Sequence, residues 1–121
     1  MRTLVCGGRQ YSNYNHICEV LDSFTYYNFA YPRGRTITLI IHGAAPGADS
    51  LAALWADARS IPALAFPADW RTHGRAAGSI RNARMLAEGK PDVVIEFSGG
   101  RGTADMVAKA RRAGMHVVQI K

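Results

Sequence analysis

The chain alternates between short, nearly continuous apolar runs and segments whose apolar residues recur at helical spacing. Such short runs are typical of buried strands in a parallel sheet, because helices cover both faces of that kind of sheet. The clearest runs lie at residues 3–6, 36–41 and 92–97, and weaker ones lie at residues 63–66 and 115–120. The sequence therefore predicts five strands.

Four segments between these strands place apolar residues on one helix face, at residues 17–24, 51–58, 80–87 and 106–113. Strands that alternate with helices predict an α/β fold, here a single doubly wound Rossmann-like domain over residues 1–121. Right-handed crossovers then give a five-stranded parallel sheet in the order 3-2-1-4-5. Gly89 and Gly114 follow two of the helices and are expected to end them in the left-handed conformation.

Composition excludes several classes of protein. The 121 residues are 48% hydrophobic, which is enough to form a core, and no apolar run approaches the roughly 18 residues of a membrane helix. No segment resembles a signal peptide, and the two cysteines, Cys6 and Cys18, cannot form a disulfide framework. We therefore expect a reduced, cytoplasmic protein that does not cross a membrane. The net charge of +6 favours a phosphate-bearing partner, although a solvated basic face explains it equally well.

Glycines gather after the carboxyl ends of the predicted strands. Nine of the 12 lie there: Gly7, Gly8, Gly43, Gly47, Gly74, Gly78, Gly99, Gly100 and Gly102. Glycine lets backbone amides approach an anion closely, and a following helix adds the positive end of its dipole. Turns between strands and helices also need small residues, but enrichment in several loops at one sheet edge favours a phosphate site. The loops after strands 1 and 4 are expected to face one another, at the point where such folds bind ligands.

Polar side chains in these loops suit a nucleotide. Arg9 is a candidate phosphate ligand, and Tyr11 could stack on a ligand or offer its hydroxyl. Asp49 is expected to contribute to the site and to cap the second helix, and Thr103 could bind phosphate or cap its helix. Trp70 could stack on a base, or it could simply cover the sheet edge.

Well-known nucleotide and metal motifs are absent from the sequence. Residues 43–48 are not followed by the Gly-Lys-Ser/Thr of a P-loop, and residues 7–11 lack the spaced third glycine of a dinucleotide fingerprint. The four histidines and two cysteines lack metal-ligand spacing, so we expect no tightly bound metal. A Mg²⁺ ion carried by the phosphates of a ligand is left open.

Four segments resemble the YspA/YpsA-related branch of the SLOG superfamily: residues 6–11, 42–49, 78–85 and 97–103. They occur in the family's order over nearly the whole chain. The resemblance implies a Rossmann-like fold that binds nucleotides or nucleotide-derived ligands, in a branch common in bacteria, phages and mobile elements. It also implies that Arg81 and Asn82 help to hold the ligand, and, by analogy, that the protein forms a homodimer.

Residues 98–106 resemble the Pro-Gly-Gly-x-Gly-Thr-x-x-Glu motif of the lonely-guy phosphoribohydrolases. The three glycines and Thr103 match, but Met106 stands at the position of the catalytic glutamate. Asp105 is adjacent, although one helical step turns it about 100° away from the required direction. The resemblance therefore carries over the phosphate-binding half of the motif and leaves its catalytic half without a match.

The leading hypothesis is a sensor or carrier domain that binds a nucleotide-derived small molecule. Its expected ligand-binding residues are Gly7, Gly8, Arg9, Tyr11, Gly43, Gly47, Asp49, Asp69, Trp70, Arg81, Asn82, Gly99, Gly100, Gly102 and Thr103. In this set, Asp69 could receive a ribose hydroxyl.

A rival hypothesis is a phosphoribohydrolase that cleaves the glycosidic bond of a nucleoside monophosphate. Its acidic group would be Asp69, Glu96 or Asp105. Glu96 interrupts a strand that is expected to be central, so it is either functional or paired with an arginine.

Two further expectations concern macromolecular partners. The positive charge and the basic stretch of Arg71, Arg75, Arg81 and Arg84 suit a DNA-binding accessory protein, which is the third hypothesis. An aromatic cluster within residues 26–31 could form a self-association surface, or it could pack against the end of the first helix.

Overall fold

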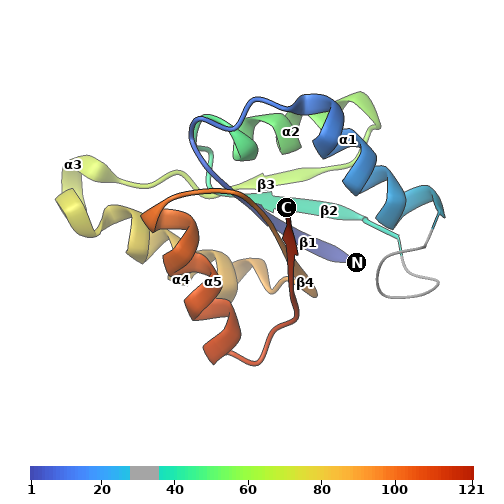
Figure 1. Ribbon diagram of the computed structural model, residues 1–121. Coiled ribbons are helices and arrows are strands. Elements are labelled where there is room, and N and C mark those ends of the chain that lie inside the picture. The colour runs from blue at the N-terminus through green and yellow to red at the C-terminus, as the bar shows by residue number, and fades with distance from the viewer. Residues whose placement is uncertain (28–35) are drawn as a thin grey trace.

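A five-stranded parallel sheet forms the centre of the protein. The computed structural model describes residues 1–27 and 36–121 (Figure 1). The strands are β1 (Arg2–Cys6), β2 (Leu39–His42), β3 (Ala63–Ala65), β4 (Val93–Phe97) and β5 (Val117–Ile120). They follow the order β3-β2-β1-β4-β5, and every neighbouring pair is parallel. The predicted α/β class, strand number and strand order are confirmed.

Helices cover both faces of the sheet, as Figure 1 shows. One face carries α1 (Tyr14–Asp22), which continues as the π-helical turn η1 (Ser23–Tyr27), together with α2 (Ala48–Ala58). The opposite face carries α4 (Ala77–Gly89) and α5 (Arg101–Arg112). The short α3 (Trp70–His73) and the 3-10 turn η2 (Gly74–Ala76) project beyond the edge where the strands end. None of the helices in the described part of the chain has both the length and the apolar character needed to cross a membrane.

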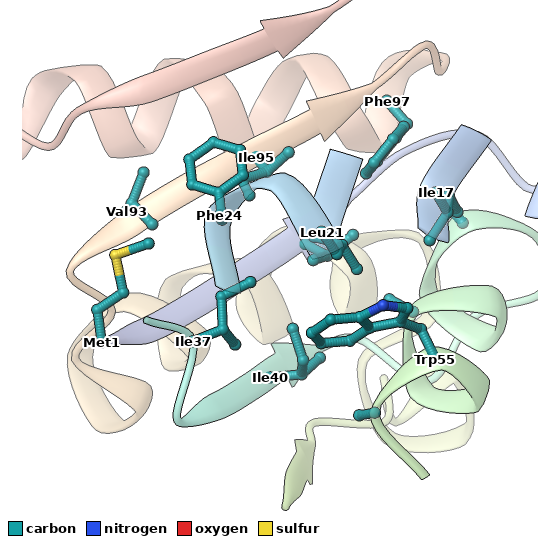
Figure 2. Close-up of a cluster of buried hydrophobic side chains, with 14 residues drawn as sticks. Met1, Ile17, Leu21, Phe24, Ile37, Ile40, Trp55, Val93, Ile95 and Phe97 are labelled. Atoms are coloured by element: carbon teal, nitrogen blue, oxygen red, sulfur yellow. The ribbon is translucent and has the colours of Figure 1, made fainter. Parts of the chain in front are cut away.

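Two apolar clusters hold the helices to the sheet. Trp55 of α2 is fully buried beside Leu21 of α1 and Ile40 of β2, and Figure 2 shows this packing. The Trp55 indole donates to the Asp22 carboxylate at 2.9 Å, so the one polar atom of this buried side chain has a hydrogen-bond partner. On the other face, Met85 and Met106 pack beneath the sheet from α4 and α5. Burial of a side chain of this size stabilises the fold by about 1.5–3 kcal/mol.

The structure corrects two local predictions. The second strand begins at Leu39, so residues 36–38 precede it. Gly89 is the last residue of α4, and the left-handed residue is Lys90, with φ of 50°. A Cβ at Gly89 would lie 3.2 Å from two Ile41 methyl carbons, so close packing of α4 on the sheet explains this glycine. Gly114, with φ of 77°, follows α5 in the left-handed conformation, as predicted.

The predicted adjacency of the loops after β1 and β4 is confirmed. Cys6 pairs with Glu96 in the register of the two strands, so both strands end at the same level. Beyond them, the Gly8 amide donates to the Ser98 carbonyl at 2.8 Å. The expected aromatic cluster within residues 26–31 lies outside the part of the chain whose side chains the structure describes.

Candidate functional site

A cavity of about 720 Å³ opens at the carboxyl ends of β1 and β4, between the loops that follow them and helices α4 and α5. The predicted ligand-binding residues line this cavity, with the exception of Gly43, Gly47 and Asp69. The sheet therefore brings together residues that are as far apart in the chain as Gly7 and Thr103. A cavity of this size falls within the range of sites for small organic ligands.

The N-terminus of α5 forms one wall of the cavity. Its N-cap residue, Gly100, provides no side-chain cap, and the backbone amides of residues 99–103 donate to no acceptor in the described parts of the chain. Gly99 permits this geometry, because a Cβ there would lie 2.2 Å from Thr103 Oγ1 and 2.7 Å from the Gly8 nitrogen. Free amides and the positive end of a helix dipole together favour an oxyanion at this wall.

The loop after β2 uses its amides differently. Asp49 Oδ2 accepts hydrogen bonds from the Gly43 amide at 3.0 Å and from the Ala45 amide at 3.3 Å. The N-cap of α2 is Gly47, so the prediction that Asp49 caps this helix is wrong. Asp49 turns back toward the loop from the first turn of α2. The Asp49 carboxylate therefore already accepts hydrogen bonds from loop amides that the sequence suggested for binding a phosphate.

Burial raises the pKa of Asp49, while the amides of Ala45 and Gly43 and the positive charges of Arg81 and Arg9 act against that rise. The side chain is 7% exposed. A charge at this depth is tolerated only where hydrogen bonds and counter-charges surround it, and all of these are present around Asp49.

Gly47 supports the site through the backbone. Its φ is 82°, and a Cβ there would lie 2.1 Å from the Gly8 carbonyl oxygen. The same carbonyl accepts the Ala48 amide at 3.1 Å. Gly47 therefore fixes the turn at Gly8 against the start of α2, and it does not line the cavity.

Three guanidinium groups line the main cavity, those of Arg9, Arg81 and Arg101. Arg81 donates from Nη1 to the Gly43 carbonyl and from Nε to Asn82 Oδ1 at 3.0 Å. Burial lowers the pKa of Arg81; the carboxylate of Asp49 opposes this effect and the charge of Arg9 adds to it. Among the described lining residues, Asp49 is the one carboxylate that faces these three cations.

Asn82 joins α4 to α5 at the side of the cavity. Its amide nitrogen donates to the Gly102 carbonyl at 3.1 Å and to Asp105 Oδ2 at 3.0 Å. Lys109 Nζ donates to the same Asp105 carboxylate at 2.8 Å. Asn82 is buried, and its hydrogen bonds orient the oxygen that holds Arg81. Asn82 lines the cavity, but its amide oxygen and its amide nitrogen both already make hydrogen bonds within the protein.

The three carboxylates predicted for catalysis lie outside the cavity lining. Asp69 is exposed and caps α3 by accepting the Thr72 amide at 3.1 Å. Glu96 accepts from Gln119 Nε2 at 2.9 Å, so its direct partner is a glutamine and not the arginine that the sequence suggested. Asp105 points toward Lys109 and Asn82, as described above.

Eight of the described lining residues were outside the predicted binding set: Cys6, Gln10, Ala45, Gly78, Met85, Ser98, Arg101 and Met106. The two methionines looked like ordinary members of the apolar stripes of their helices. Met106 carried a signal, because it stands where the lonely-guy motif has its glutamate, and the structure places it in the cavity wall. Cys6 also lines the cavity, but burial, together with the charges of Asp49 and Glu96, raises the pKa of its thiol.

The four arginines of the predicted basic stretch lie in different parts of the structure. Arg71 and Arg75 are exposed on α3 and η2, Arg81 lines the cavity, and Arg84 pairs with Glu88 at 2.9 Å. The basic stretch is therefore divided among different environments.

Within residues 1–27 and 36–121, no group of three or more His, Cys, Asp or Glu side chains is placed to hold a metal ion.

Comparison with known proteins agrees with this architecture. The model of the family described as "YAcAr: YspA, cpYpsA-related SLOG family" matches residues 1–73. The chain is 31% identical over 124 residues to the Gene 61 protein of Mycobacterium phage D29, a match that covers 97% of this chain and 94% of the phage protein. No solved structure matches the chain significantly. The family match and the phage relative show that the chain belongs to the YspA, cpYpsA-related SLOG family.

Proposed function

We propose that the protein binds a nucleotide or nucleotide-derived ligand in the main cavity, as a sensor or carrier domain. The observation that carries the proposal is the row of amides at residues 99–103, which have no acceptor within residues 1–27 and 36–121 and lie at a cavity that also holds the guanidinium groups of Arg9, Arg81 and Arg101. Amide donors and guanidinium forks are the groups with which proteins bind phosphate. The phosphate is placed at the N-terminus of α5.

The remainder of the cavity suits the uncharged part of such a ligand. Cys6, Met85 and Met106 provide an apolar wall, and the rings of Tyr11 and Trp70 line the cavity as well. Trp70 is 49% exposed, so its ring is accessible to a ligand. An aromatic ring beside an apolar wall favours a flat base.

The proposal is tested by thermal unfolding in the presence of a panel of ribonucleotides. A ligand that binds only the folded protein raises the Tm, with a stabilisation that follows RT ln(1 + [L]/Kd). We expect at least one nucleotide to raise the Tm of the wild type. A panel in which no nucleotide changes the Tm would overturn the proposal.

Matched variants locate the binding site. Arg101→Ala and Arg112→Ala remove the same charge from opposite ends of α5, and the structure places Arg101, but not Arg112, in the cavity wall. We expect Arg101→Ala to reduce the nucleotide-induced shift and Arg112→Ala to preserve it. Gly102→Ala adds a methyl group at a cavity residue, where it meets no protein atom within 4 Å. This variant should fold normally, since alanine favours a helix, and should lose the shift.

A further inference from the structure

A second, smaller cavity of about 240 Å³ adjoins the main one. The loop of residues 43–46 and the segment Pro67 and Ala68 form its outer walls. Arg9, Trp70 and Arg81, with Ala45, line both cavities, so these side chains form the boundary between the two. A ligand bound in the main cavity therefore meets the smaller one across a boundary that carries two guanidinium groups.

The charged donors available in the smaller cavity are two side-chain cations. The amides of Gly43 and Ala45 donate to Asp49, and the Ala44 amide donates to His42 Nδ1 at 3.0 Å. These loop amides are thus already in use. Arg9 and Arg81 are the charged residues of the lining, and no acidic residue of the described chain lines this cavity with them.

Arg9 has the features of an anion-binding side chain. It is exposed, its guanidinium carbon lies 5.5 Å from the centre of the Trp70 ring, and it makes no hydrogen bond to a described residue. Arg81 uses Nη1 and Nε on Gly43 and Asn82, which leaves Nη2 without a hydrogen bond among the described residues. Two guanidinium groups held on one boundary repel one another, and a bound oxyanion between them would relieve that repulsion.

This position is separate from the wall formed by α5. None of the residues 99–103 lines the smaller cavity, so their amides do not reach an anion there. The two positions are nevertheless close. Asn82 bridges them, accepting from Arg81 Nε at 3.0 Å and donating to the Gly102 carbonyl at 3.1 Å. One side-chain amide thus connects the two anion-binding groups, an arrangement that suits two anionic groups linked within one ligand.

We infer that the site takes a ligand with two linked anionic groups, of the nucleoside diphosphate class, with the first phosphate at the N-terminus of α5 and the second between Arg9 and Arg81. The inference rests on the proposed function and adds to it the number of phosphates and the residues that select for the second one.

The test compares each of the four ribonucleoside 5′-monophosphates with its 5′-diphosphate by titration calorimetry at constant ionic strength. A charge-assisted hydrogen bond to the second phosphate predicts that the diphosphate of the preferred base binds at least about tenfold more tightly. Arg9→Ala should reduce this ratio to less than about threefold and change the affinity for the monophosphate less. Arg9 makes no hydrogen bond within the described chain, so the variant should fold, which circular dichroism verifies.

Arg75→Ala is the matched control, because it removes one exposed positive charge that lines neither cavity. It should keep the wild-type preference for the diphosphate. Equal affinities for the mono- and the diphosphate would overturn the second phosphate position. An equal loss of the diphosphate preference in Arg9→Ala and Arg75→Ala would do the same. Either result would leave the proposal of nucleotide binding intact. Failure of every nucleotide to bind would overturn the proposed function, and this inference with it.

Discussion

The Asp105 carboxylate accepts the Asn82 amide at 3.0 Å, across the contact between α5 and α4. Lys109, one turn further along α5, donates to the same carboxylate and also to Ser79 Oγ at 2.8 Å. Asn82 in turn accepts Arg81 Nε. Asp105, next to the position of the lonely-guy motif's glutamate, therefore acts on the cavity through Asn82 and Arg81, as a positioning residue.

Replacing Asp105 should destabilise the protein and disturb the cavity together. Asp105→Ala is expected to lower the free energy of unfolding by about 1–2 kcal/mol at neutral pH, because it removes one acceptor from buried Asn82 and the counter-charge from Lys109. Urea denaturation measures the change. Glu88→Ala removes a similarly spaced but more exposed ion pair on α4 and should have much less effect. Equal losses in the two variants would contradict the positioning role.

The stability difference between the wild type and Asp105→Ala should depend on pH in a direction set by the pKa of Asp105. Burial pushes the pKa of Asp105 upward, but hydrogen bonds from Lys109 and Asn82 and the charge of Lys109 outweigh it, so the pKa lies below its ordinary value of 3.8. The stability that Asp105 contributes is therefore present above pH 3.8 and is lost as the pH falls through the lower folded-state value. The difference in free energy of unfolding between the wild type and Asp105→Ala, measured by urea denaturation, should therefore decrease in that acidic range.

Asp49 should show the opposite pH dependence. Its pKa is raised above the ordinary value of 3.8, so the folded state holds its proton more tightly than the unfolded state does. The stability of the wild type relative to Asp49→Asn should be greatest below pH 3.8 and should decline as the pH rises toward the folded-state value. Urea denaturation at a series of pH values measures this difference. A stability difference that stays constant with pH, or increases with it, would contradict the raised pKa of Asp49.

Two glycine substitutions should separate backbone strain from ligand binding. Gly47→Ala places a Cβ 2.1 Å from the Gly8 carbonyl at a φ of 82°, and we expect it to cost more than about 2 kcal/mol of stability. Gly100→Ala introduces the same methyl group where no protein atom lies within 4 Å. Its unfolding temperature without ligand should stay close to that of the wild type. A well-folded, fully stable Gly47→Ala protein would contradict the close approach of these loops.

The wild-type protein should not release a base from nucleoside monophosphates. Met106 occupies the cavity wall at the motif's glutamate position, and Asp69, Glu96 and Asp105 do not line the cavity. Cleavage of a glycosidic bond needs a carboxylate near the developing positive charge of the sugar. Asp49, the one carboxylate of the described lining, already accepts the amides of Gly43 and Ala45. Chromatography after prolonged incubation checks for free base against a protein-free control. Release of base together with ribose 5-phosphate would instead support the phosphoribohydrolase hypothesis.

The sequence by itself determined the fold and the edge of the sheet that carries the cavity. Alternation of apolar runs with helical stripes is a local pattern, because it reflects which side of each element is buried, and it predicted five strands and their order. The glycines after β1 and β4 were equally informative. Gly99 and Gly8 allow backbones to approach in a way that no other residue permits, so their position marked where the two loops meet.

Only the tertiary structure decided which donors and acceptors remain available to a ligand. Asp49 takes the amides of its own loop, Asp105 turns toward Lys109, and Arg81 reaches the Gly43 carbonyl. Arg81 and Gly43 lie 38 residues apart, and Asn82 and Asp105 lie 23 apart. Partners at such separations meet because strand register and helix packing place them together. Local periodicity records the burial of a residue, but it does not record the direction in which its polar atoms point.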